Sequence, residues 1–286
     1  MVRKFIQTIC VLSLMFCVSC CSASVEPNGL KSEKTEPNKV DTILAKLNKR
    51  TQDLKTYECQ IEYRHVQPSV FDTQTLRNGI LYYSKSENRS NLRVNFTTSQ
   101  QDEEQERKYN EHYIIVDGAA LPKTGGGYKG LWLVQLDYEI KSAKYIQIAE
   151  ADEPNKPVDV FELVSKKFPI VGFTKADRLK EEFEITIPAK KKDSSEDLIQ
   201  VQLKVKPNSV YKDNYVQIDC WIDEKQNLPV KIHAISTGPE GESNENKDYY
   251  EIKFLKAQVN EKIDKKVFDF QIPKDFDEPE FYPLDN

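Results

Sequence analysis

The last third of the chain contains Asn227-Leu228-Pro229-Val230-Lys231-Ile232, then Tyr250-Glu251-Ile252-Lys253-Phe254, and then Val267-Phe268-Asp269-Phe270-Gln271-Ile272-Pro273. Each stretch is short, rich in β-branched and aromatic residues, and bounded by polar residues or proline, as strands commonly are. An acidic loop separates the first two stretches, and a polar break at residues 260–263 separates the last two. This order predicts a strand, a loop, a second strand, a break and a short final strand.

A two-residue period runs through most of the chain after Thr56. Tyr57, Cys59, Ile61 and Tyr63 alternate with polar residues, which places them on one buried face of a strand. Similar stretches predict further strands near residues 79–84, 92–96, 112–117, 131–138, 145–149, 183–187, 199–205, 216–222, 229–236, 250–254 and 267–272. Most of the loops between them are short and polar, which favours an antiparallel sandwich or barrel. A composition of 38% hydrophobic and 30% charged residues suits a sheet with one wet face.

Two segments have a helical period instead. The spacing of apolar residues predicts a helix over residues 39–55, and Asn38 can cap its first turn. A second helix is predicted over residues 158–167, ending before Pro169. Its apolar stripe consists of Val160, Phe161, Val164 and Phe168. This stripe has two interpretations, a core helix packed on a sheet or an apolar lid over a cavity.

The first 24 residues predict an export signal. Arg3 and Lys4 precede an apolar run at residues 5–18, which is short for a bilayer, and small residues follow it. A retained membrane anchor helix is the alternative. Residues 25–38 are polar and predict a tether, so residues 39–286 are expected to form a single domain. The mature protein is expected in the bacterial periplasm or anchored to a membrane that faces it.

Cys17-Val18-Ser19-Cys20 resembles a bacterial lipobox, the motif whose last cysteine is lipidated and becomes the new N-terminus. The resemblance implies that Cys20 is a lipid-anchor site and a possible membrane tether. Cleavage after Ala23, which would leave a soluble exported protein, is the alternative.

Charge and cysteine content limit the partners and the chemistry of the mature chain. Loss of Arg3 and Lys4 with the leader changes the net charge from −5 to −7, which argues against nucleic acid as a partner. Cys59 and Cys220 are the cysteines outside the leader. In an oxidising compartment they can form one disulfide, and two buried unpaired thiols are the alternative.

Motifs that would indicate catalysis are weak in this sequence. His65, His112 and His233 fall on separate predicted strands without metal-ligand spacing. The glycines at residues 125–127 lack the Gly-Lys-Ser/Thr ending of a phosphate loop, and no Gly-x-Ser-x-Gly motif is present. We therefore expect no enzyme activity, no catalytic residue, no metal and no cofactor.

Several weak motifs in a fixed order resemble the bacterial lipoprotein-carrier family, LolA/LolB. Besides the final strands they are a helix followed by Tyr57-Glu58-Cys59-Gln60-Ile61, then Gly79-Ile80-Leu81-Tyr82, Leu92-Arg93-Val94 and Val116-Asp117-Gly118. The resemblance implies a mainly β fold with a few helices. Its curved antiparallel sheet would form an incomplete β-barrel, with helices packed against the concave face. It also implies that Arg93 holds a cargo's polar head or latches a lid formed by Val160, Phe161, Val164 and Phe168. An ordinary outward-facing arginine is the alternative for Arg93, because it alternates with Leu92 and Val94.

The expected function is non-enzymatic. The carrier resemblance implies an envelope protein that binds acyl chains or the anchors of lipidated proteins in an apolar cavity, as in lipoprotein sorting and transport. An envelope sensor or protein-interaction module with the same fold and no lipid cargo is the alternative. The discriminating feature is the cavity, because a sensor can fill its interior with its own aromatic side chains.

Overall fold

A computed structural model describes residues 38–68, 72–86, 90–121, 128–150, 160–165, 168–189, 197–239, 241 and 243–284. Contacts divide the chain into Met1–Glu36 and Pro37–Asn286, and the description below concerns the second unit. The predicted export signal, Cys20 and most of the predicted tether lie outside the described residues, so the export signal, the lipid anchor and the tether stay predictions. No helix in the described part of the chain is long and apolar enough to cross a membrane.

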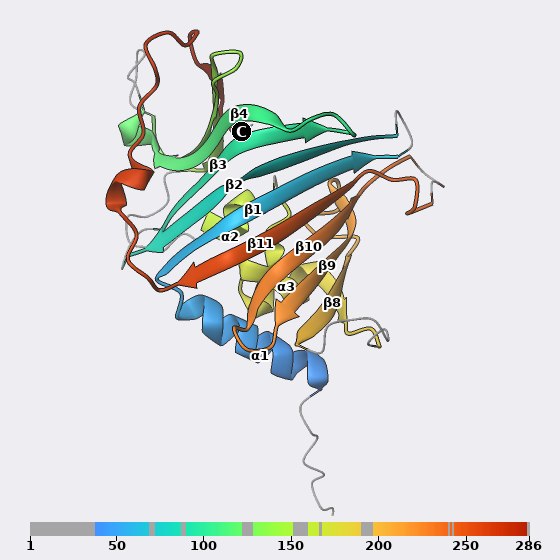
Figure 1. Ribbon diagram of the computed structural model, residues 1–286. Helices are drawn as coiled ribbons and strands as arrows, with labels where there is room; N and C mark the ends of the chain where they lie inside the picture. Colours follow the sequence, from blue (N-terminus) through green and yellow to red (C-terminus); the bar gives the residue numbers. More distant parts are fainter. Residues whose placement is uncertain are drawn as a thin grey trace, which may run out of the picture. The chain divides into compact units, whose positions relative to one another are not determined.

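The described strands form one twelve-stranded sheet, in the order β12-β6-β5-β4-β3-β2-β1-β11-β10-β9-β8-β7 (Figure 1). Their bounds are β1 Thr56–Gln67, β2 Thr73–Lys85, β3 Ser90–Gln101, β4 Arg107–Asp117, β5 Leu131–Asp137, β6 Ser142–Ala149, β7 Phe183–Thr186, β8 Leu198–Val205, β9 Tyr215–Asp223, β10 Leu228–Ser236, β11 Tyr249–Val259 and β12 Glu280–Tyr282. Every pairing is antiparallel except that of β12 with β6. The sheet does not close, which confirms the mainly β, incompletely closed fold.

One face of the sheet, here called the inner face, carries the larger hydrophobic core. Helices α1 (Lys39–Gln52), α2 (Val160–Val164) and α3 (Ala176–Glu182) and the 3-10 turn η2 (Val171–Phe173) pack on it. In Figure 1, α1 crosses below the ends of β11, β10 and β9, and α2 and α3 lie behind the sheet. These short elements share one core because each strand supplies apolar side chains at every second position.

Helix α1 begins where the sequence predicts it to begin. The Asn38 side chain accepts a hydrogen bond from the Val40 N–H, and Ile43, Leu44 and Leu47 are buried. The helix ends at Gln52, before the predicted Lys55, because the N–H groups of Lys55 and Thr56 donate to the Asn260 side chain where β1 begins. Helix α2 spans Val160–Val164, and the outer parts of the predicted 158–167 helix lie outside the described residues.

The opposite face, here called the outer face, has a second core on β4, β5 and β6. Residues 260–284, here called the strap, cross this face after β11 and contain η3 (Lys265–Phe268) and β12. The predicted strand at 267–272 is wrong. Strand β11 already pairs with β1 and β10 and has no free edge, so Phe270 and Ile272 pack flat on the outer face instead. The sequence pattern also missed α3 and the three-residue β12.

Candidate functional site

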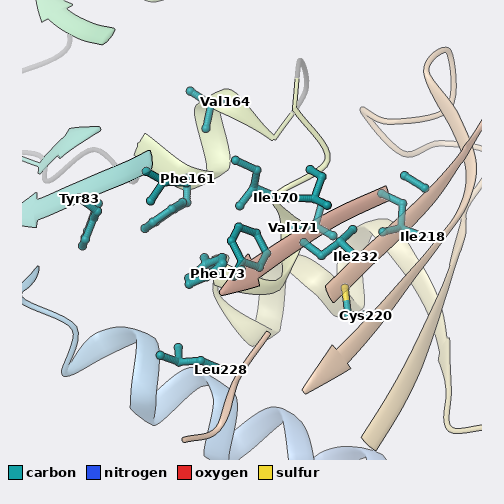
Figure 2. Close-up of a cluster of buried hydrophobic side chains, with 14 of the residues drawn as sticks. Tyr83, Phe161, Val164, Ile170, Val171, Phe173, Ile218, Cys220, Leu228 and Ile232 are labelled. Carbon is teal, nitrogen blue, oxygen red and sulfur yellow. The ribbon is translucent and has the colours of Figure 1, made fainter. Parts of the chain in front are cut away.

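The predicted apolar stripe lies on the inner face, where the chain fills its own interior. Val160, Phe161 and Val164 are at most 2% exposed. The Phe161 ring stacks on Phe173 with centroids 4.7 Å apart and contacts Tyr83 at 4.5 Å (Figure 2). The residues described between 160 and 173 are here called the inner segment, and they pack as core in this conformation.

Phe168, the last residue of the stripe, is partly buried among aromatic rings from the sheet. Its ring centroid lies 4.8 Å from that of Tyr113 on β4 and 6.1 Å from that of Tyr63 on β1. The structure therefore brings all four predicted stripe residues onto one face. Aromatic side chains of the protein itself occupy the space between the inner segment and the strands.

The turn η2 anchors the inner segment tightly at one end. A Cβ atom on Gly172 would lie 2.7 Å from Cγ of Pro229 on β10, so only glycine allows this approach without a shift. The Thr174 hydroxyl donates to the Val171 carbonyl at 2.7 Å and stabilises the end of the turn. In Figure 2, Val171 lies next to Ile232 of β10, which shows where this anchor sits on the sheet.

A buried polar cluster adjoins this apolar region on the inner face. Glu111 of β4 is 2% exposed and accepts hydrogen bonds from Arg77 at 2.8 Å, Tyr113 at 2.9 Å and Gln135 at 2.7 Å. The guanidinium of Arg77 also lies over the Tyr109 ring, 5.1 Å from its centroid. A carboxylate removed from water needs such partners, because an unpaired buried charge is strongly unfavourable. Arg77, Glu111, Tyr113 and Gln135 are here called the Glu111 cluster.

The Glu111 cluster lies at the end of the apolar stripe. Arg77 is directly opposite Tyr63 across the β1–β2 ladder, and both Tyr63 and Tyr113 contact Phe168. Burial opposes the charged form of Arg77, but the Glu111 carboxylate raises its pKa overall. The Nε atom of Arg77 is buried and has no hydrogen-bond partner among the described residues. One donor next to the apolar interior is thus available to a polar group of a ligand.

Sequence reasoning missed this cluster, although its pattern is visible. Glu111 lies in phase with Tyr109, Tyr113 and Ile115, on the buried side of a predicted strand. A single acidic residue at such a position indicates a buried partner, but the alternation alone cannot say which basic residue supplies it.

Arg93 lies on the outer face, away from the inner segment. Its guanidinium donates to the carbonyls of Val267 at 2.8 Å and Asp269 at 3.0 Å, and to the side chains of Asn95 at 2.7 Å and His112 at 2.9 Å. A cavity of about 260 Å³ lies beside it, under the strap. Leu92, Val94 and Phe96 face the inner core, so the alternating Arg93 must face outward. The structure does not bring Arg93 and the stripe together; Arg93 holds the strap.

The two cysteines are buried free thiols. Cys59 is on β1 and Cys220 is on β9, and strands β11 and β10 lie between these two. At about 4.8 Å per strand, β1 and β9 are about 14 Å apart, whereas a disulfide needs Cα atoms within about 7 Å. The structure therefore corresponds to the alternative of two buried thiols and not to the disulfide. Burial raises the pKa of both thiols, which makes them poor nucleophiles.

The histidines lie on three different strands and have separate partners. His65 on β1 stacks on Tyr250, His112 on β4 accepts from Arg93, and His233 on β10 contacts Tyr249. Within the described ranges, no three His, Cys, Asp or Glu side chains gather as a metal site would require.

His112 should make the protein sensitive to acid. Burial, together with the charge of Arg93, lowers the pKa of His112 to about 4. An unfolded histidine with a pKa of about 6.5 takes up its proton first, so the free energy of unfolding should fall as the pH drops from about 6.5 to about 4. We expect the decrease in the free energy of unfolding to be about 1–2 kcal/mol smaller in His112→Gln than in the parent. Urea unfolding at pH 7 and pH 4.5 measures this difference. His65 and His233 remain in both proteins, so parallel pH profiles for parent and variant would contradict the assignment.

Comparisons with known proteins identify no family for this chain. No protein-family model and no curated protein matches it. Similar solved structures include a DUF1329 family protein from Desulfovibrio piger, with 6% identity, a TM-score of 0.39 and coverage of 80% of this chain and 97% of that one. A putative outer membrane lipoprotein-sorting protein domain from Vibrio parahaemolyticus has 10% identity, a TM-score of 0.36 and coverage of 80% and 97%. A chain of the Pseudomonas aeruginosa MucA/MucB complex has 9% identity, a TM-score of 0.41 and coverage of 82% and 62%. At these values the likeness identifies neither a ligand nor a partner.

Proposed function

We propose that this protein is a non-enzymatic envelope protein that holds acyl chains, or the anchor of a lipidated protein, between the inner face and the inner segment. One observation carries the proposal. Part of the apolar inner face is covered by a segment that contains a five-residue helix and a 3-10 turn, and this segment contributes large apolar side chains and no strand. A short segment can leave such a face without breaking the sheet, and acyl chains can replace its side chains.

The free energies are compatible with this exchange. Moving one CH₂ group from water to an apolar site gives about 0.8 kcal/mol, so a chain of about sixteen carbons gives on the order of 12 kcal/mol. Exposing two phenylalanine side chains, such as Phe161 and Phe168, costs on the order of 6 kcal/mol. An acyl chain that displaces these two rings, while the valines of the stripe stay packed, therefore leaves a net gain for binding.

In this proposal the Glu111 cluster takes the polar end of the cargo. Arg77 is a cation on the inner face opposite Tyr63, whose ring contacts Phe168. Its Nε–H can donate to a carbonyl or ester oxygen. Arg93 acts indirectly, by holding the strap on the outer face. Export and lipidation at Cys20 belong to the same proposal and place the site on the periplasmic side of a membrane.

Binding of a fluorescent fatty acid to the parent and to Phe161→Glu tests the proposal. We expect the parent to bind the probe, and the variant to bind it at least about tenfold more weakly, because a charge on the inner face must be desolvated. Ile140→Glu is the matched control, since Ile140 is 66% exposed on a turn. The thermal midpoint of each protein is measured alongside.

No probe binding to the parent, together with a large loss of stability in Phe161→Glu, would contradict the carrier. That result would favour an envelope sensor or interaction module. One observation favours this alternative specifically: Phe161, Phe168 and Phe173 of the protein itself fill the inner face.

A further inference from the structure

The end of the strap pairs with the sheet differently from every other described strand. Strand β12 runs parallel to β6 and pairs with Lys144, Tyr145 and Ile146, whereas β6 extends over Ser142–Ala149. Three paired residues form few hydrogen bonds. The edge of β6 therefore accepts an extended segment in parallel orientation, and side chains must supply most of the attachment.

Phe281 supplies this attachment by entering an aromatic pocket. Its ring stacks on Tyr128 with centroids 4.7 Å apart and planes 9° apart. It also contacts Tyr145 at 4.7 Å and Trp132 at 6.2 Å. Tyr128, Trp132 and Tyr145 are here called the Phe281 pocket, which selects a flat aromatic side chain.

The fit between Phe281 and this pocket is incomplete. The Tyr145 hydroxyl is buried and has no hydrogen-bond partner among the described residues, and its burial raises the pKa of Tyr145. A buried hydroxyl ordinarily finds a partner, and a phenylalanine ring cannot provide one. An occupant that places a polar atom beside Tyr145 would satisfy the pocket better than Phe281 does.

The residues of the strap are less buried than the surface beneath them. None of its residues from 260 to 284 is buried, whereas Trp132, Val134 and Tyr145 below it are at most 3% exposed. Segments with few buried contacts open locally at lower free energy than core strands. The strap can therefore open locally and exchange with another segment.

Charge defines what kind of segment the edge accepts. Asp275 pairs with Lys141 at 3.1 Å, and Glu280 lies opposite Lys144 in the β12–β6 register. Residues 275–284 contain four acidic residues and no basic residue. An acidic, extended segment with an aromatic side chain is thus complementary to this edge.

We propose that the edge of β6 and the Phe281 pocket form a docking site for an acidic, extended, aromatic-bearing segment of a partner protein. The partner segment adds to β6 as a parallel strand and inserts its aromatic side chain among Tyr128, Trp132 and Tyr145. Residues 275–284 occupy the site in the free protein and compete with the partner. The site is on the outer face and does not depend on acyl-chain binding at the inner face.

The test uses the full chain, as parent and as Phe281→Ala, with a fluorescein-labelled synthetic peptide of residues 275–284 as probe. We expect anisotropy to show that Phe281→Ala binds this peptide at least about tenfold more tightly than the parent does, because its internal competitor has lost the ring that fills the pocket. The same peptide carrying Phe281→Ala should not bind, and added salt should weaken binding of the intact peptide.

Failure of a folded Phe281→Ala protein to bind the intact peptide would overturn the proposal. Hydrogen exchange of the parent is a second test of the proposal. It does not use the variant, so it applies even if the variant does not fold. We expect the amides of residues 280–282 to exchange by local opening, at least about a hundredfold faster than those of β1 and β2. Exchange only through global unfolding would overturn the proposal. So would a dimer of the parent protein in light scattering, since the strap with its intact Phe281 ring would then exchange between copies of this chain.

Discussion

Replacing Arg77 with methionine should lower the free energy of unfolding by about 3 kcal/mol. Arg77 donates to Glu111 at 2.8 Å, and the Glu111 side chain is only 3% exposed. Removing one partner of a buried ion pair leaves the other charge without compensation, which typically costs about 3–5 kcal/mol. The lower value applies because Tyr113 and Gln135 still donate to the carboxylate and because the Arg77 side chain is 29% exposed. Urea unfolding at pH 7 measures the difference.

The matched control is Arg107→Met. Arg107 also lies over the Tyr109 ring, but its partner is Glu139 and both side chains are far more exposed, at 58% and 35%. We expect a much smaller loss there, because water screens an exposed ion pair. The double variant Arg77→Met/Glu111→Gln should recover at least half of the loss in stability, because it removes the unpaired negative charge of Glu111. Equal losses for Arg77→Met and Arg107→Met would show that Glu111 does not depend on Arg77.

Substituting Gly79 by alanine should destabilise the protein by about 3 kcal/mol or more. A Cβ atom at this position would lie 2.1 Å from the Asn95 carbonyl oxygen and 2.9 Å from the Phe96 Cα atom. Both are backbone atoms of the neighbouring strand β3, next to a register shift in the β2–β3 ladder, so the clash cannot be relieved by a rotamer change. The strands would have to separate at the centre of the sheet. Thermal and urea unfolding of the variant measure the effect.

Gly241→Ala separates this steric effect from the general cost of replacing glycine. Gly241 has a φ of +85°, and nothing lies within 4 Å of a Cβ atom built there. Its replacement should cost about 1 kcal/mol, from backbone strain alone. A Gly79→Ala protein as stable as Gly241→Ala would mean that β2 and β3 can move apart without loss of the inner core.

Different segments cover the inner and the outer face of the sheet, so the proposed acyl-chain site and the proposed docking site are physically separate. The inner face is covered by the inner segment and the helices, and the Glu111 cluster lies at the edge of that apolar region. The outer face is covered by the strap, which Arg93 holds at one end and the Phe281 pocket at the other. Loss of fatty-acid binding should therefore leave peptide binding unchanged, and the reverse should also hold.

Sequence alone predicts most of the strands, the first helix and the alternation of buried and exposed residues along those strands. These features depend on local periodicity and capping, so the buried face from Tyr57 to Tyr63 and the Asn38 cap follow from neighbouring residues. The direction of Arg93 stayed open, because the alternation and the carrier resemblance favour different roles for it. The stripe of Val160, Phe161, Val164 and Phe168 was also visible, because four apolar residues at helical spacing must pack on something.

The segments that cover each face of the sheet, and the pairs of polar residues that meet, follow from the three-dimensional fold. Arg77 and Glu111 are 34 positions apart, and Arg93 meets the Val267 carbonyl 174 positions away. The alternation of Phe270 and Ile272 was read as a strand, but the structure gives these residues a sheet face to pack on and no edge to pair with. The same two-residue period serves both arrangements, because it records only which side of an extended chain is apolar. Whether that side meets a sheet face, a neighbouring segment or a ligand depends on contacts between residues far apart in the chain.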